Sequence, residues 1–224
     1  MQIARAAGIP APKVLSVGEH PPGSTFWPVS ILMTRLPGLE LINIDMPFEE
    51  NLEGPWVGEL KKCLDTMRTW DSPYGQRICS PINTSIKSSR VPKHVMGPFE
   101  NEAALHEYLL KPASSHSFAS REKYEETLAL ARRIQERPHQ VVFTHGDFKE
   151  HNVLVDDDSN LTGWLDWESA GWYPEYWEFT TARRMGRDTW WGQAVSGLGG
   201  DRYEEELESD IALNQLTVDS YVAF

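Results

Sequence analysis

The chain has 224 residues, of which 40% are hydrophobic and 24% are charged, so it can bury a core as one large domain or as a domain with a small appendage. Its formal net charge of -12 argues against nucleic acid or an anionic membrane as a partner, because both attract basic surfaces. No stretch is apolar and long enough to span a bilayer, and the N-terminus lacks the apolar region of a signal peptide. We therefore expect a cytoplasmic protein that acts on a small molecule.

The N-terminal region is predicted to form a helix end followed by a β-hairpin. Residues 2–8 have the pattern of a last helical turn that Gly8 ends, and the prolines that follow cannot continue a helix. Residues 13–19 and 25–36 are rich in β-branched and aromatic residues, which is typical of strands. Turn-forming residues separate the two segments, so the sequence predicts a hairpin.

The middle of the chain is predicted to be helical, with one long irregular segment. Residues 48–70 have the spacing of an amphipathic helix, carried by Leu52, Val57, Leu60, Leu64 and Met67. Residues 71–98 contain turn formers and little periodicity, so we expect a long loop there. Residues 101–110 and 120–136 predict two further helices, the second with Ser120 as its N-cap.

Short strands and polar loops follow the helices. Residues 140–147 read as a short apolar strand that enters a polar loop, and residues 152–156 and 161–167 read as a hairpin with the acidic run 156–158 in its turn. Helices are expected again from Glu175, ending in an amphipathic terminal helix.

A set of polar residues stands between positions 145 and 166. It comprises His145, Asp147, Lys149, Asn152 and Asp166. A hairpin returns its far end to the loop where it started, so Asp147, Asn152 and Asp166 can converge on one pocket. One carboxylate that orients a hydroxyl, with an amide and a second carboxylate that hold Mg²⁺, is the arrangement that phosphoryl transfer requires.

The phrase HGDFKEHN followed by LDWE resembles the aminoglycoside phosphotransferase and choline kinase family, whose members are relatives of protein kinases. Fungal members of this family carry phrases similar to GPF before a helix and AGWYPEYWE after the metal-binding aspartate. Both phrases stand here, at residues 97–99 and 170–178. The resemblance runs from about Ile9 to the C-terminus.

The resemblance implies a role for each matched position. Asp147 would be the catalytic base or the hydroxyl-orienting carboxylate, and Asn152 and Asp166 would be the magnesium ligands. His145 would fix the loop through a hydrogen bond to the backbone near Asp166. Lys149 would either face the transferred phosphate or remain a solvated lysine, and the sequence leaves these two readings open.

The resemblance also implies an α+β, protein-kinase-like fold. Residues 1–40 would be the remnant of an N-terminal β-lobe with its linker, and residues 41–224 would be the mostly helical C-terminal lobe. Backbone groups around Met33, Arg35 and Leu36 would face the adenine of ATP in that linker.

Family members place a Gly-rich loop and a strand lysine before the linker. The sequence has no Gly-rich loop ahead of Ile9, and Lys13 is a poor substitute for the lysine. The leading hypothesis is a small-molecule phosphotransferase that uses ATP and Mg²⁺ to phosphorylate a hydroxyl. Two alternatives are an ATP-independent biosynthetic enzyme (a cyclase, dehydratase or lyase, with Asp147 or His145 as acid or base) and a non-catalytic pseudokinase. A homo-oligomer that covers apolar strand surface around Val29 and Ile31 is a further expectation.

Overall fold

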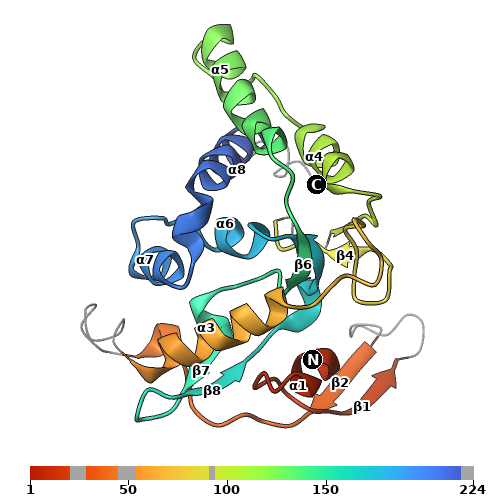
Figure 1. Ribbon diagram of the computed structural model, residues 1–224, viewed down its shortest axis with the longest axis vertical. Coiled ribbons are helices and arrows are strands. Elements are labelled where there is room, and N and C mark those ends of the chain that lie inside the picture. The colour runs from red at the N-terminus through yellow and green to blue at the C-terminus, as the bar shows by residue number, and fades with distance from the viewer. Residues whose placement is uncertain (21–28, 45–53, 91–93, 218–224) are drawn as a thin grey trace. The chain divides into compact units, whose positions relative to one another are not determined.

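The computed structural model describes residues 1–20, 29–44, 54–90 and 94–217 (Figure 1). It divides into two compact units. Unit 1 comprises Met1–Thr66 and Lys149–Asp166, and unit 2 comprises Met67–Phe148 and Trp167–Phe224. The predicted lobe boundary between residues 40 and 41 stays a prediction.

Unit 1 begins with helix α1 (Gln2–Ala6), which ends before Gly8, a residue with a φ of 81°. Strands β1 (Val14–Glu19) and β2 (Val29–Met33) then form an antiparallel hairpin, with Val17 opposite Ile31. These elements confirm the predicted helix end and hairpin. The turn residues 21–28 lie outside the described residues.

The β1–β2 hairpin exposes apolar side chains. Leu15, Val17 and Leu32 are 54%, 59% and 62% exposed, and the side chains of Val29 and Ile31 are about half exposed. This agrees with the apolar strand surface expected around Val29 and Ile31. The homo-oligomer itself stays a prediction.

A three-stranded sheet in the order β3-β7-β8 forms the rest of the β-structure of unit 1, from β3 (Leu39–Glu40), β7 (Val153–Val155) and β8 (Leu161–Trp164). A short 3₁₀ helix (Leu41–Asn43) follows β3. In the β7–β8 turn, the Asp156 carboxylate accepts hydrogen bonds from the N–H groups of Asp158 and Asn160. These bonds lower the pKa of Asp156, so the acidic run is a turn, as predicted.

Helix α3 (Pro55–Arg68) carries the apolar face that the sequence predicted. It starts with proline, which has no N–H to leave unpaired in the first turn. Its buried residues are Trp56, Leu60, Leu64 and Met67. The predicted helix began at residue 48, but residues 45–53 lie outside the described part of the chain.

In unit 2, the segment predicted as a long loop contains short pairings. Strands β4 (Ile86–Lys87) and β5 (Val95–Met96) pair antiparallel, and isolated bridges join Ile78 to Phe99 and Cys79 to Trp172. The long segment is therefore mostly loop, with two short strands and two bridges that the sequence did not predict. Two-residue strands are too short to produce a visible period in the sequence.

Helices make up most of unit 2. Asn101 caps α4 (Glu102–Leu110), and Ser120 caps α5 (Arg121–Arg132), each through a side-chain oxygen that accepts a backbone N–H. A 3₁₀ turn (Arg133–Glu136) extends α5, and α5 packs along α8 (Figure 1). The remaining helices are α6 (Trp177–Arg183), α7 (Trp190–Gly197), a 3₁₀ turn (Gly200–Tyr203) and α8 (Glu204–Thr217).

Strand β6 (Val141–Thr144) pairs antiparallel with β9 (Gly171–Pro174) in the middle of unit 2. The sequence predicted β6 but not β9, whose residues GWYP lack alternation because the whole strand is buried. Several tryptophans of this region are buried core residues, among them Trp167, Trp172, Trp177 and Trp191. No helix within the described ranges is long and apolar enough to cross a membrane.

Candidate active site

The buried strand β6 positions the polar loop. All four residues of β6 are buried, and the loop His145, Gly146, Asp147 follows directly. The paired strand β9 lies beside it, with Thr144 opposite Gly171. Two strands with fixed register therefore set where the loop begins in unit 2.

His145 is fully buried, and its contacts are those of a residue that shapes the loop. Its Nδ1 accepts a hydrogen bond from the N–H of Asp147 at 3.3 Å. Its ring packs edge-on against Trp167, with 4.6 Å between the ring centroids. These contacts tie His145 to the loop that it begins, and the predicted hydrogen bond to the backbone near Asp166 stays a prediction.

Gly146 adopts a φ of 85°, a conformation that side chains disfavour. A Cβ at this position would lie 2.3 Å from the carbonyl oxygen of Ser169. The glycine of the HGD phrase is therefore required by the close approach of two backbone segments.

The loop is hydrogen-bonded to Glu178, a residue for which the sequence predicted no role. The Glu178 carboxylate, on α6, is fully buried and accepts hydrogen bonds from the N–H groups of His145 at 2.6 Å and Gly146 at 3.2 Å. One side chain thus holds the two residues that precede Asp147. Its sequence signal was a single charged residue between Trp177 and Phe179 in an aromatic helix.

Burial raises the pKa of Glu178 to about 7. The cation of Arg68 and the two backbone N–H groups lower it, while the charge of Asp147 raises it. Glu178 therefore titrates near neutral pH, beneath the loop that carries Asp147.

The predicted magnesium ligands lie together in unit 1. Asn152 is buried at the end of a 3₁₀ turn (Glu150–Asn152), and its carbonyl accepts the N–H of Leu165 at 2.7 Å. Asp166 follows Leu165 and has a φ of 57°, which is rare for a residue with a side chain. The β7–β8 hairpin thus brings the two residues to one end of the sheet, as the sequence predicted.

The donor set fits Mg²⁺. An amide oxygen and a carboxylate are hard oxygen ligands, and Mg²⁺ in phosphoryl-transfer sites takes few protein ligands beside phosphate and water. No group of three or more His, Cys, Asp or Glu side chains with metal-binding geometry occurs in the described residues. The predicted site has one asparagine and one aspartate, so it is too small to count as such a group.

Lys149 directly precedes the 3₁₀ turn that ends at Asn152. Its carbonyl accepts the N–H of Asn152 at 3.0 Å, and its side chain is partly exposed. The backbone of Lys149 therefore helps to place Asn152, and the role of its ammonium group stays a prediction.

A pocket of about 440 Å³ in unit 1 lies along the predicted linker. Its lining includes the three residues expected to face a nucleotide, Met33, Arg35 and Leu36, and its other lining residues include Leu154 and Leu165. The volume lies in the range of small-molecule sites. Leu165, one of the lining residues, directly precedes Asp166 in the chain.

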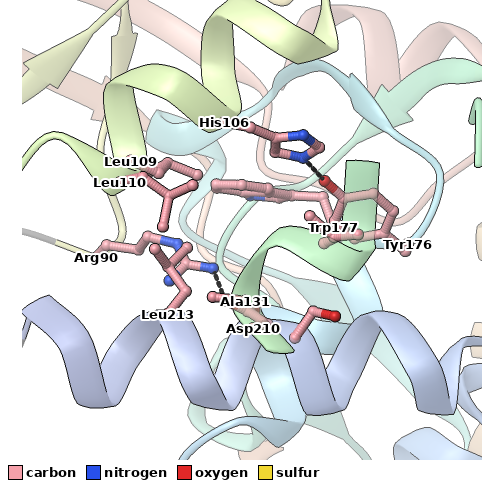
Figure 2. Close-up of a pocket in the computed structure, with 11 residues that line it drawn as sticks. Arg90, His106, Leu109, Leu110, Ala131, Tyr176, Trp177, Asp210 and Leu213 are labelled. Atoms are coloured by element: carbon pink, nitrogen blue, oxygen red, sulfur yellow. Dashed lines mark hydrogen bonds and ion pairs between the residues drawn. The ribbon is translucent and has the colours of Figure 1, made fainter. Parts of the chain in front are cut away.

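A second cavity lies among the helices of unit 2 but is too small for a substrate. Its volume is about 10 Å³, which holds no more than about one water. His106 is hydrogen-bonded to the Tyr176 hydroxyl at 2.7 Å, and Arg90 is paired with Asp210 on α8 (Figure 2). This cavity is part of a buried polar network in the helical core.

The acidic residues of α8 have partners within the chain. Arg187 pairs with Glu204 and Glu208, and Arg137 pairs with Glu205. The helix therefore presents a salt-bridged face.

Comparison with solved structures defines the class of fold. An apo thermostable mutant of aminoglycoside phosphotransferase APH(4)-Ia aligns over 97% of this chain and 73% of its own, with a TM-score of 0.61 and 17% identity. The GDP and kanamycin complex of APH(2")-IIia aligns over 99% of this chain and 73% of its own, with a TM-score of 0.64 and 11% identity. The chain has the α+β, kinase-like fold of these enzymes.

The family follows from the sequence. A family model described as the phosphotransferase enzyme family matches residues 1–210, and the chain belongs to this family. The search of curated proteins found no match. The resemblance inferred from HGDFKEHN and LDWE is thereby confirmed.

Proposed function

We propose that this chain is a small-molecule phosphotransferase that transfers the γ-phosphoryl group of ATP to a hydroxyl group. One observation carries the proposal. The linker pocket of unit 1 reaches Leu165, and Leu165 joins Asp166 to the backbone of Asn152. One lining residue of a pocket of small-molecule size is thus the chain neighbour of Asp166 and the hydrogen-bond partner of Asn152, an amide and a carboxylate suited to Mg²⁺.

Each side chain has a defined task in this proposal. Asn152 and Asp166 would hold Mg²⁺, which would supply positive charge against the phosphates. Asp147 orients the acceptor hydroxyl and takes its proton, and Glu178 fixes the loop on which Asp147 stands. Phosphoryl transfer depends mostly on such positioning and charge stabilisation. Lys149 faces the transferred phosphate.

The ligands of similar structures support a nucleotide and a small-molecule acceptor. A mutant of APH(4)-Ia, with a TM-score of 0.60, 16% identity and coverage of 96% of this chain and 72% of its own, was solved with ADP and hygromycin B. The net charge of -12 favours a cationic or neutral acceptor. A cytoplasmic location stays part of the proposal.

Calorimetry with the purified chain tests nucleotide binding. Titration with ATP and Mg²⁺ is expected to give saturable heat, which Asp166→Asn abolishes because the variant loses a magnesium ligand. Lys111→Gln, a change on an exposed residue, serves as the control and should bind as the wild type does. Absence of heat at millimolar nucleotide would reject the proposal and favour the ATP-independent enzyme or the pseudokinase.

A further inference from the structure

The ring of His139 lies between two carboxylates that belong to different helices. Its Nδ1 is 2.8 Å from Oε1 of Glu102, the first residue of α4, and its Nε2 is 3.3 Å from Oε1 of Glu206 on α8. The side chains of His139, Glu102 and Glu206 are 6%, 16% and 9% exposed. Little water therefore competes for either contact.

Two contacts of this kind require two hydrogens. A neutral imidazole carries one N–H and its other nitrogen is an acceptor, while an ionised carboxylate is an acceptor only. Both distances therefore correspond to hydrogen bonds only when the cluster holds one proton more than a neutral histidine and two carboxylates. The doubly protonated ring of His139 supplies both donors, and the two carboxylates compensate its charge.

The other rings near His139 do not take over either contact. The ring of Tyr176 packs edge-on against His139, with 4.7 Å between the centroids, and its hydroxyl is bonded to Nε2 of His106 at 2.7 Å (Figure 2). The same nitrogen of His106 lies 3.5 Å from Oε1 of Glu102. Burial lowers the pKa of His106, so this second imidazole adds no positive charge beside His139 near neutral pH.

The neighbouring charged groups on α8 and on the turn after α5 have their own partners. They form the ion pairs Arg183–Glu204, Arg187–Glu204, Arg137–Glu205 and Arg90–Asp210. Arg133 and Arg137 also line a small cavity with Glu206. In the part of the chain that the structure describes, the ion-pair partner of the Glu206 carboxylate is His139.

The backbone next to the ring is fixed by the start of the paired strands. Gln140 follows His139, and its N–H donates to Oε1 of Glu175 at 3.2 Å. Its carbonyl accepts the N–H of Glu175 at 2.9 Å. A change in the contacts of the His139 ring therefore acts on the two helices rather than on the strand.

We propose that His139, Glu102 and Glu206 form a proton-dependent clamp between α4 and α8. The protonated ring binds both carboxylates. After the loss of one proton, the ring keeps its hydrogen on Nδ1 for the shorter contact to Glu102, and the lone pair of Nε2 faces the Glu206 carboxylate. Two acceptors repel each other, so the first turn of α8 moves away from the ring.

The pKa of His139 changes in the direction that this clamp requires. Burial lowers the pKa, but the hydrogen bonds and charges of Glu102 and Glu206 raise it above the ordinary histidine value overall. The clamp is thus closed at acidic pH and opens as the pH rises through the folded-state pKa.

A pH titration of the ring ¹⁵N shifts in the labelled full chain tests the clamp, because these shifts report which ring nitrogen carries hydrogen. Both nitrogens of His139 should be protonated near pH 6, and the midpoint should lie above about 6.5. The neutral ring should carry its hydrogen on Nδ1. The backbone amide of Leu207, next to Glu206, should shift with the same midpoint, and that of Leu216 at the far end of α8 should not.

Glu206→Gln keeps the size of the side chain but removes its charge. The amide can donate to the neutral Nε2, so the contact no longer needs the extra proton, and the His139 midpoint should fall by about 1 pH unit. The Leu207 amide should then no longer follow the ring. Glu205→Gln is the matched control, an exposed residue on the same turn, and should titrate as the wild type does.

Several results would overturn the proposal. They are a His139 ring that is already neutral near pH 6, a neutral ring with its hydrogen on Nε2, and a Leu207 amide that does not follow the ring. A Glu206→Gln variant that loses stability while the His139 midpoint stays unchanged would show a purely structural contact, and would overturn it too. If Glu206→Gln does not fold, the wild-type titration decides alone. No outcome depends on phosphoryl transfer, so the clamp and the proposed function can fail separately.

Discussion

The Glu178 carboxylate accepts the backbone N–H of His145 at 2.6 Å, although the two residues are 33 positions apart. The same carboxylate accepts the N–H of Gly146. Helix α6 therefore sets the path of the loop that leads to Asp147. A change in the charge or position of Glu178 should be transmitted to Asp147 through two backbone hydrogen bonds.

Glu178 should make the chain less stable as the pH rises toward neutral. Its folded-state pKa is raised to about 7, so between the ordinary carboxyl pKa and pH 7 the folded chain binds more protons than the unfolded chain. The stability from protonated Glu178 is complete below the unfolded pKa and is lost as the pH rises through about 7. The whole effect is at most about 3 kcal/mol.

Glu178→Gln should flatten this part of the stability curve. Urea denaturation between about pH 5 and pH 8 measures the slope. Glu136→Gln, at an exposed position, should keep the wild-type slope. An unchanged slope in Glu178→Gln would show that another group titrates in this range.

His139 should contribute more stability at acidic than at alkaline pH. Its two ring nitrogens contact Glu102 at 2.8 Å and Glu206 at 3.3 Å. Burial lowers the pKa of His139, but the two carboxylates outweigh burial and raise it above the ordinary value. Its contribution is complete below the unfolded histidine pKa of about 6.5 and is lost as the pH rises through the folded value.

His139→Gln should therefore cost about 1 kcal/mol near pH 6 and less near pH 9. Thermal and urea unfolding at both pH values provide the comparison, with His116→Gln as the exposed control. Equal losses at the two pH values would mean that His139 acts as a neutral side chain.

The losses of stability from mutating Arg90 and Asp210 should be strongly non-additive. Their side chains are 7% and 1% exposed, and Arg90 also lies over the Trp177 ring at 4.9 Å (Figure 2). Arg90→Met should cost about 3–5 kcal/mol, because it leaves the buried Asp210 carboxylate uncompensated. Arg90→Met/Asp210→Leu should recover much of that loss in a double-mutant cycle. Additive losses would contradict a buried ion pair.

Gly146→Ala should disrupt the loop and lower stability by at least about 2 kcal/mol, because the added Cβ meets the Ser169 carbonyl at a positive φ. Gly58→Ala is the matched control, since a Cβ there has open space on helix α3. It should stabilise the chain by about 1 kcal/mol. Similar effects of the two variants would contradict the close backbone approach at Gly146.

The sequence predicted the elements whose signals are local. The spacing of Leu60, Leu64 and Met67 predicted α3, and Ser120 predicted the start of α5. The pairing of Asn152 with the Asp166 end of the hairpin was predictable because β7 and β8 are adjacent in the chain. Periodicity, caps and short hairpins can be recognised in a sequence without knowledge of tertiary contacts.

What the sequence did not reveal depends on distant contacts. Arg68 reaches the carbonyl of Glu175 over a separation of 107 residues, and Arg90 reaches Asp210 over 120. Strand β9 is buried on both faces and shows no alternation. Half-buried and buried charges of this kind look like surface residues in a sequence, because burial is decided by packing and not by neighbours in the chain.

A phosphoryl-transfer assay tests the proposed function most directly. The chain would be incubated with Mg²⁺ and either ATP or GTP and a panel of hydroxyl-bearing small molecules, and mass spectrometry would detect an acceptor that gains one phosphoryl group. We predict transfer by the wild type and a loss of at least about 100-fold in Asp147→Asn, which keeps the size of the side chain but removes the base. Transfer that Asp147→Asn leaves unchanged, or no transfer to any acceptor from either nucleotide, would contradict the account.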